Sequence, residues 1–269
     1  MKLSYTTMAT PGMTVKEEAG LARKFGYKGI DLRVSDNLGE INISSSYRDI
    51  TEVKDILNTE GIMLAGLFCY NHCAGAEDNS WDKMKQSILK HIELANLLGS
   101  PSIRIFAGNP LNAPDEKDFI KRTADIVSQV LVSDGTDTSV VLQNHLNGFS
   151  VTQGIMMAEI INNDRFGLAF SPDHSVLMGE DLHLIDTMLK KHAKQFYLAD
   201  LSINGGIHKT VLPGKGNVPL KSAFNLIGAK SFRGWITVKW EKIWHQELES
   251  AEIILPYFKE YIEKNLIQS

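Results

Sequence analysis

Short apolar runs alternate with longer amphipathic stretches along the whole chain. An apolar run of about four to eight residues between turn signals predicts a buried strand, and apolar positions three or four apart predict a helix. The strand pattern occurs at Leu3–Thr7, Gly29–Val34, Met63–Tyr70, Ser102–Phe106, Ser139–Gln143, Gly167–Phe170, Gln195–Ala199 and Trp235–Trp240. The helical pattern occurs at Val15–Phe25, Ile50–Glu60, Trp81–Leu98, Glu116–Val132, Gln153–Asn162, Asp181–His192, Leu220–Ala229 and Glu247–Lys264.

This alternation predicts a (β/α)8 TIM barrel, in which each strand is followed by a helix. Such a barrel needs about 250 residues, so we expect the 269 residues to form a single domain over positions 1–269. Gly26, Gly61, Gly99 and Gly228 follow helical patterns, where a left-handed helix end favours glycine. A doubly wound open sheet is the main alternative. The absence of GxGxxG after the first strand weakens its dinucleotide-binding version.

Polar residues lie between the apolar positions of several predicted strands. Strand side chains alternate between two faces, and in a barrel the apolar set faces the helices. The polar set must then face the barrel interior, where groups without partners are costly. Many of these residues come late in their strands, at the end where such barrels build active sites. The set predicted to face inward is Asp31, Arg33, Arg104, Val141, Gln143, His145, Ala169, Ser171, Tyr197, Thr237, Lys239 and Glu241.

A purely structural role for these charges is the alternative. Asp31 could pair with Arg33, and Lys239 with Glu241, to form a self-satisfied network. Buried ion pairs contribute little stability by themselves, so we favour a functional pocket.

Seven short segments resemble the xylose isomerase-like sugar phosphate isomerase/epimerase barrels. The resemblance covers nearly the whole chain and implies an enzyme of carbohydrate metabolism. It is carried by the order and spacing of Gly29-Ile-Asp-Leu-Arg33, Arg104-Ile-Phe-Ala-Gly108, Leu142-Gln-Asn-His145, Ser171-Pro-Asp-His174, Tyr197-Leu-Ala-Asp200, Pro213-Gly-Lys-Gly216 and Lys239-Trp-Glu241.

The resemblance also implies a divalent metal held by Glu, Asp, His and Glu at the ends of strands five to eight. The matching residues here are Gln143, Ser171, Tyr197 and Lys239. None of them is the expected ligand, because hard divalent ions prefer anionic oxygen ligands. We therefore expect no cofactor, and Mn, Mg, Zn or Co only if the family site survives in altered form.

Lys239 is the residue on which the proposed chemistry centres. Its ammonium could replace the metal as the fixed positive charge, while His145, His174 or Glu241 moves a proton. By the resemblance, His145 and His174 lie near substrate. Alternatively, Lys239 could form a Schiff base in an aldolase or lyase. A third hypothesis is that the chain is a non-catalytic sugar-binding barrel.

Other residues are candidates for binding a small carbohydrate substrate. Arg33, Arg104 and Lys239 favour an anionic ligand such as a sugar acid. Gln143, Ser171 and Tyr197 can hydrogen-bond to a sugar. Asp173 could orient His174, and Asp200 matches a family aspartate. His72, Trp244 and His245 follow predicted strands, and the glycine-rich segment Lys209–Val218 is a loop that could cover the substrate.

Composition narrows the cellular setting. A net charge of −4 and the absence of basic runs argue against nucleic-acid binding. The two cysteines, Cys69 and Cys73, lack the second ligand pair of a structural zinc site and fit a reduced cytoplasm. We expect no signal peptide, no membrane span and no membrane partner, because no apolar segment is long enough. A homodimer is a possible assembly.

Overall fold

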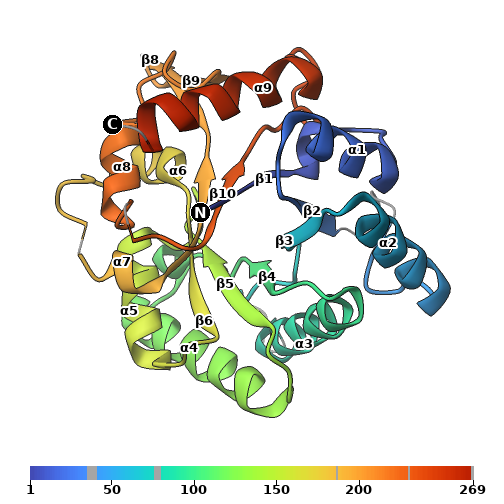
Figure 1. The fold of residues 1–269 in the computed structure, drawn as a ribbon. Helices are drawn as coiled ribbons and strands as arrows, with labels where there is room; N and C mark the ends of the chain where they lie inside the picture. The colour runs from blue at the N-terminus through green and yellow to red at the C-terminus, as the bar shows by residue number, and fades with distance from the viewer. Residues whose placement is uncertain (35–40, 76–79, 186, 230, 268–269) are drawn as a thin grey trace.

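The computed structural model describes residues 1–34, 41–75, 80–185, 187–229 and 231–267. Within these ranges, eight parallel strands close into a barrel with helices around its outside (Figure 1). The predicted (β/α)8 barrel is therefore confirmed. Around the barrel the strands are β1 (Lys2–Thr6), β2 (Gly29–Val34), β3 (Met63–Cys69), β4 (Ser102–Ile105), β5 (Ser139–Gln143), β6 (Phe166–Phe170), β7 (Ala193–Leu198) and β10 (Trp235–Val238).

The helices begin and end at the signals that the sequence contains. Thr14 and Ser46 cap the first two long helices, each through a reciprocal capping box, and Gly26 and Gly61 end them with positive φ. No helix in the described ranges is both long and apolar enough to cross a membrane. The helices are α1 (Val15–Phe25), α2 (Tyr47–Glu60), α3 (Ser80–Leu98), α4 (Glu116–Ser133), α5 (Val151–Ile161), α6 (Pro172–Leu177), α7 (Leu189–His192), α8 (Leu220–Leu226) and α9 (Ala251–Tyr261), with short segments η1 (Thr7–Ala9), η2 (Pro110–Asn112) and η3 (Ile262–Ile267).

The connection between β6 and β7 differs from the prediction. The helix predicted over Asp181–His192 is wrong for most of its length: only α7 is helical, and residue 186 lies outside the described residues. The helical turns instead come earlier, in α6, because Pro172 fits the first position of a helix. The Asp181 side chain accepts a hydrogen bond from the His183 backbone N–H, which favours a turn there.

A two-stranded hairpin follows β7 and was not predicted. Strands β8 (Asp200–Asn204) and β9 (Ile207–Val211) pair antiparallel, so the first part of the predicted loop Lys209–Val218 is in fact a strand. The two-residue turn is Gly205-Gly206, and both glycines have positive φ. A Gly-Gly pair between two short strands is a hairpin signal, and it was available in the sequence.

The barrel wall separates two hydrophobic clusters, as strand alternation predicts. The larger cluster lies between barrel and helices and includes Ile103, Leu142 and Phe196. The smaller cluster fills the barrel interior. It consists of Met8, Phe68, Val141, Ala169 and Tyr197.

A hydrogen-bonded layer closes the part of the barrel interior that lies away from the carboxyl ends of the strands. The Asp31 carboxylate accepts hydrogen bonds from the Tyr197 hydroxyl at 2.7 Å and the Gln195 amide at 2.9 Å. The Gln195 amide also donates to the Thr237 hydroxyl, which contacts the Ser4 hydroxyl. No ion pair between Asp31 and Arg33 occurs in the described structure, so the alternative that paired them is not observed: Asp31 is held by uncharged neighbours instead. Burial raises the pKa of Asp31 to about 6, although Tyr197, Arg104 and Gln195 oppose the shift.

The first prediction concerns this carboxyl and the stability of the barrel. Because its folded pKa lies above its unfolded value, the ionised form is disfavoured by folding. Asp31 should therefore lower the free energy of unfolding as pH rises from about 4 to about 6, by up to roughly 3 kcal/mol. The free energy of unfolding of D31N should not show this decrease with pH. Urea unfolding of both proteins at pH 4 and pH 7 measures it, and a stability difference that is the same at both pH values contradicts the assignment.

Candidate functional site

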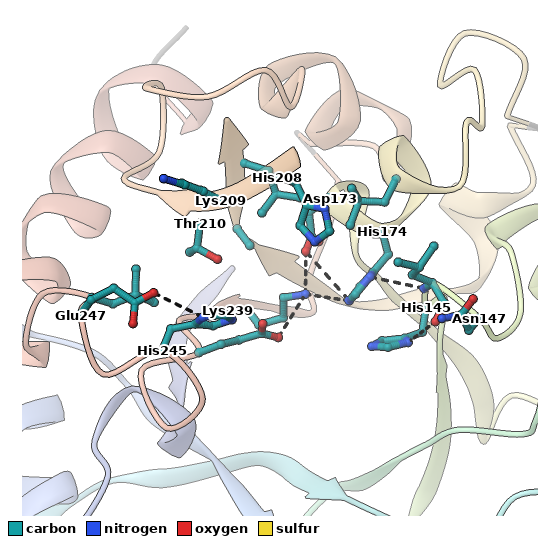
Figure 2. A pocket seen from close by; sticks show the side chains of 16 residues that line it. His145, Asn147, Asp173, His174, His208, Lys209, Thr210, Lys239, His245 and Glu247 are labelled. Carbon is teal, nitrogen blue, oxygen red and sulfur yellow. Dashed lines mark hydrogen bonds and ion pairs between the residues drawn. The ribbon is translucent and has the colours of Figure 1, made fainter. Parts of the chain in front are cut away.

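Lys239 forms the centre of a charged cluster at the carboxyl ends of the strands. It directly follows β10 and is 3% exposed. Its Nζ lies 2.6 Å from Asp173 Oδ2 and 2.9 Å from His174 Nε2, both on α6, and 3.8 Å from Glu241 Oε1 (Figure 2). Removing an ammonium from water is costly unless opposite charge and hydrogen bonds compensate. The short contact to Asp173 supplies the main compensation.

Asp173 is ionised in this arrangement. Its Oδ1 accepts a hydrogen bond from the Ser171 hydroxyl at 2.9 Å, while Oδ2 faces Lys239. Burial by itself would raise the pKa of Asp173, but Lys239, His174 and Ser171 stabilise the carboxylate and hold the pKa at about 2. The cluster therefore keeps a positive and a negative charge side by side through the physiological pH range.

His145 presents a free basic nitrogen. Its Nδ1 lies 2.6 Å from the Leu146 carbonyl oxygen, which can only accept, so Nδ1 carries the proton. No hydrogen-bond partner of Nε2 occurs among the described residues, so its lone pair is available for chemistry. Burial lowers the pKa of His145, and the nearby positive charge of Lys239 lowers it further. The ring is therefore neutral at pH 7 and suited to accept a proton.

His174 has the same protonation state but a different environment. Its ring centroid lies 4.0 Å from that of His145, and burial and Lys239 lower its pKa well below the usual value. Nε2 faces Lys239 at 2.9 Å, and Nδ1 faces the Leu146 N–H at 3.4 Å. A neutral imidazole has one acceptor nitrogen. The shorter, charge-assisted contact from Lys239 is the stronger of the two, so His174 Nε2 is already engaged.

Two adjoining cavities meet at this cluster. One, of about 480 Å³, is lined by Lys239 and other charged or polar side chains together with several leucines, and we call it the polar lobe. The other, of about 320 Å³, has several aromatic walls, and we call it the aromatic lobe. His145, His174 and Glu241 line both. The remaining polar-lobe residues include Asn147, Asp173, His208, Lys209, Thr210, His245 and Glu247; those of the aromatic lobe are Met8, Phe68, Tyr70, Phe106, Gln143 and Trp244.

Eight of the residues singled out in the sequence line these lobes. The alternation argument placed several of them on one inner face, and the barrel brings them together from β5, β6 and β10 and from the segments that follow these strands. They are Lys239, His145, His174, Glu241, Asp173, Gln143, Trp244 and His245.

Four other candidates lie behind the cavity walls. Ser171 is fully buried and hydrogen-bonds to Asp173, and Tyr197 is fully buried and donates to Asp31. The Arg104 guanidinium stacks between rings, 3.4 Å from the Phe68 centroid and 4.0 Å from that of Phe106. Arg33 stacks behind two further rings, those of Tyr70 and Trp244, at 5.1 and 5.2 Å. These four support the residues that line the site.

The last two candidates have other surroundings. Asp200 accepts hydrogen bonds from four backbone N–H groups, those of Leu201, Gly214, Gly216 and Val218. Its carboxylate is thus occupied in holding the loop after the hairpin. His72 is exposed and lines neither lobe. Its backbone N–H donates to the Ser87 hydroxyl of α3.

The hairpin also contributes residues to the site. His208, Lys209 and Thr210 on β9 line the polar lobe (Figure 2). Lys209 and Thr210 begin the segment that the sequence suggested as a cover for the substrate, whereas His208 was missed. Phe68 and Phe106, at the ends of β3 and β4, were missed as well. The Gly205-Gly206 turn could have revealed the hairpin. The position of its side chains over the barrel depends on how Asp200 anchors the returning loop.

Comparisons with known proteins agree with this architecture. The family model described as "Xylose isomerase-like TIM barrel" matches residues 19–260. The chain belongs to this family. A search of curated proteins found no match.

Solved structures of the same fold are similar over nearly their whole length. The IOLI protein with a bound zinc atom has a TM-score of 0.79 at 18% identity, covering 98% of this chain and 97% of that one. A D-allulose 3-epimerase from Methylomonas sp. has a TM-score of 0.77 at 12% identity, covering 99% and 98%. The probable 3-DHS dehydratase AsbF of petrobactin synthesis in Bacillus anthracis has a TM-score of 0.75 at 13% identity, covering 98% and 100%. At these identities the likeness shows the fold alone.

The zinc of the IOLI protein raises the question whether this family member can hold a divalent ion. The residues at the strand ends of this chain do not fit a divalent ion. Gln143 and Ser171 are neutral, the Tyr197 hydroxyl donates to Asp31, and the Lys239 ammonium contacts Asp173. A second cation beside Lys239 would be repelled. Across the residues that the structure describes, no three His, Cys, Asp or Glu side chains are grouped as metal ligands.

The second prediction tests the electrostatics of His145. Removing the positive charge with K239M should raise the pKa of His145, whereas E241Q should lower it further, because Glu241 opposes the shift. Burial remains in both variants, so neither restores the full ordinary value. Histidine ring signals followed by NMR against pH measure these changes. Shifts in the same direction in both variants would be incompatible with the assigned charges.

Proposed function

We propose that this chain is an isomerase or epimerase that moves a proton on a carbohydrate or sugar-acid substrate, with the Lys239 ammonium as its fixed positive charge. One observation carries the proposal. The buried ammonium lies against Asp173 and His174 in the wall of a cavity that also contains the free Nε2 of His145. A neutral base and a fixed cation on one cavity wall are the two parts that enolisation of a carbonyl compound needs.

The proton transfer follows from this arrangement. His145 Nε2 removes a proton from the carbon next to the substrate carbonyl, and the C–H electrons move to form the enolate. Lys239 stabilises the negative charge that develops on the oxygen. The imidazolium of His145 then delivers the proton through the enediol to the neighbouring carbon for an isomerisation. For an epimerisation the proton must reach the same carbon from the opposite face, so the enolate must turn over in the cavity before His145 returns the proton. His174 is less suited as base because its Nε2 already contacts Lys239.

The family comparisons support the reaction class. Two of the similar structures are named as sugar epimerases, the D-allulose 3-epimerase of Methylomonas sp. and a D-psicose 3-epimerase of Clostridium cellulolyticum H10. The polar lobe also offers many hydrogen-bonding side chains, as a hydroxylated ligand requires.

The geometry disfavours Schiff-base chemistry at Lys239. A nucleophilic amine must be neutral, whereas the 2.6 Å contact with Asp173 stabilises the ammonium. A non-catalytic sugar-binding protein would have the same cavity but would not move a proton. Deuterium transfer from heavy water to a carbon of the ligand therefore distinguishes an enzyme from such a binding protein.

The third prediction measures that exchange. In heavy water, the protein should transfer deuterium to the reacting carbon of a ligand from a panel of ketohexoses and sugar acids, read by NMR. H145Q should reduce the rate by about 10²–10⁴ and K239M by about 10²–10³. The controls H183Q, at an exposed turn, and K194M, at the opposite end of the barrel, should retain the rate. If H145Q exchanged deuterium at the wild-type rate, His145 would not be the base.

The fourth prediction concerns metal removal. Chelation of the purified protein should leave the exchange rate unchanged, because Lys239 supplies the positive charge. One equivalent of Mn, Zn, Co or Mg bound at Gln143, Ser171, Tyr197 and Lys239 would overturn the role of Lys239. Borohydride trapping of a keto sugar on Lys239 would instead favour the lyase alternative.

A further inference from the structure

The aromatic lobe is a separate compartment beside the reaction centre. Its walls come from four connections that follow different strands: Met8 after β1, Tyr70 after β3, Phe106 after β4 and Trp244 after β10. Phe68, on β3, completes the set. The polar lobe by itself already has the size of a small-molecule site. A second compartment of about 320 Å³ therefore leaves space for a further part of the ligand.

Two large rings in this lobe remain open to solvent. Tyr70 is 38% exposed and Trp244 is 52% exposed. The Arg33 guanidinium lies 5.1 Å from one ring centroid and 5.2 Å from the other, and its cation–π contacts hold both rings in place. Rings that are fixed before a ligand arrives bind with a smaller loss of conformational entropy. The aromatic wall is thus prepared to receive a flat apolar surface.

The lobe contains few polar groups for a ligand. Apart from the shared His145, His174 and Glu241, its polar groups are the Gln143 amide, which is 1% exposed, the Tyr70 hydroxyl, which donates to the Met8 sulfur, and the Trp244 indole N–H. Gln143 Nε2 donates to Ser171, but its Oε1 has no hydrogen-bond partner among the described residues. That oxygen is itself buried, so it adds little polar surface to the cavity. The lobe therefore fits a flat ring better than a sugar whose rim carries several hydroxyls.

We propose that the aromatic lobe is a subsite for an aryl group attached to the sugar, so that the substrates are keto sugars that carry an aryl substituent; phenyl glycosides, which have no carbonyl group, serve as unreactive binding probes. This inference rests on the proposed function for the sugar half of the ligand. The sugar occupies the polar lobe, the reacting carbon lies at His145 where the lobes meet, and the aryl ring stacks on Tyr70 and Trp244. A second sugar could also present a flat C–H face, and the test separates the two.

The experiment compares ligands that differ only in the substituent. Phenyl and methyl glycosides of glucose, galactose and mannose, and a disaccharide of each, are titrated against the protein by tryptophan fluorescence and thermal shift. The phenyl form of at least one hexose should bind about tenfold tighter than its methyl form. Y70A and W244A should reduce this ratio to about twofold or less, and W244F should retain it, since a ring remains.

A matched control lies elsewhere on the molecule. Trp81 on α3 packs against Phe119 at 4.9 Å and lines neither lobe, so W81A should keep the wild-type ratio. Equal binding of phenyl and methyl forms, no binding of any phenyl form, or an advantage that survives Y70A and W244A overturns the proposal. A gain for the disaccharide without a phenyl gain assigns the lobe to a second sugar and also overturns it.

Binding and chemistry are read separately. A phenyl preference without deuterium exchange leaves the subsite standing and rejects the proposed reaction. Exchange on free sugars without any phenyl preference rejects the subsite and leaves the reaction standing.

Discussion

The arrangement of the site depends on the burial of one ammonium. Lys239 is almost removed from solvent, and an isolated buried cation would cost several kcal/mol. Asp173 must therefore lie in direct contact, and Ser171 must satisfy its second oxygen. Because Asp173 and His174 share the first turn of α6, the same requirement fixes His174 against the ammonium. One charge thus determines the positions of its neighbours.

The same charge divides the work between two similar histidines. Both are buried beside Lys239, and both have a lowered pKa. His174 Nε2 accepts a hydrogen bond from the ammonium. His145 instead donates from Nδ1 to the Leu146 carbonyl oxygen, and its Nε2 has no partner among the described residues. A fixed cation and a free base then face one cavity. In this family member, Lys239 occupies a place that the family resemblance gives to a metal ligand, and it brings its own positive charge.

The barrel interior supports this cluster in layers. The lowest layer is the hydrogen-bonded set around Asp31, and Tyr197 belongs to it through its hydroxyl. Above it, Arg104 lies between Phe68 and Phe106, whose rings also form the aromatic lobe. Arg33 and Arg104 therefore act through aromatic rings, and the cavity walls remain largely apolar on that side. The opposite side carries the charged cluster, so the site has two chemically different halves.

The sequence by itself determined the barrel, the inner face of each strand and most of the residues of the charged cluster. These follow from local periodicity, since strand alternation fixes which side chains share a face. Only the tertiary structure decided which inward residues reach the cavity: Tyr197 and Ser171 have the right parity but lie below it, and Asp200 is used by the returning loop. The hairpin residues His208 and Lys209, and the pairing of Lys239 with Asp173 rather than mainly with Glu241, were likewise set by packing. Contacts between residues distant in the chain depend on side-chain reach and loop path, which periodicity does not encode.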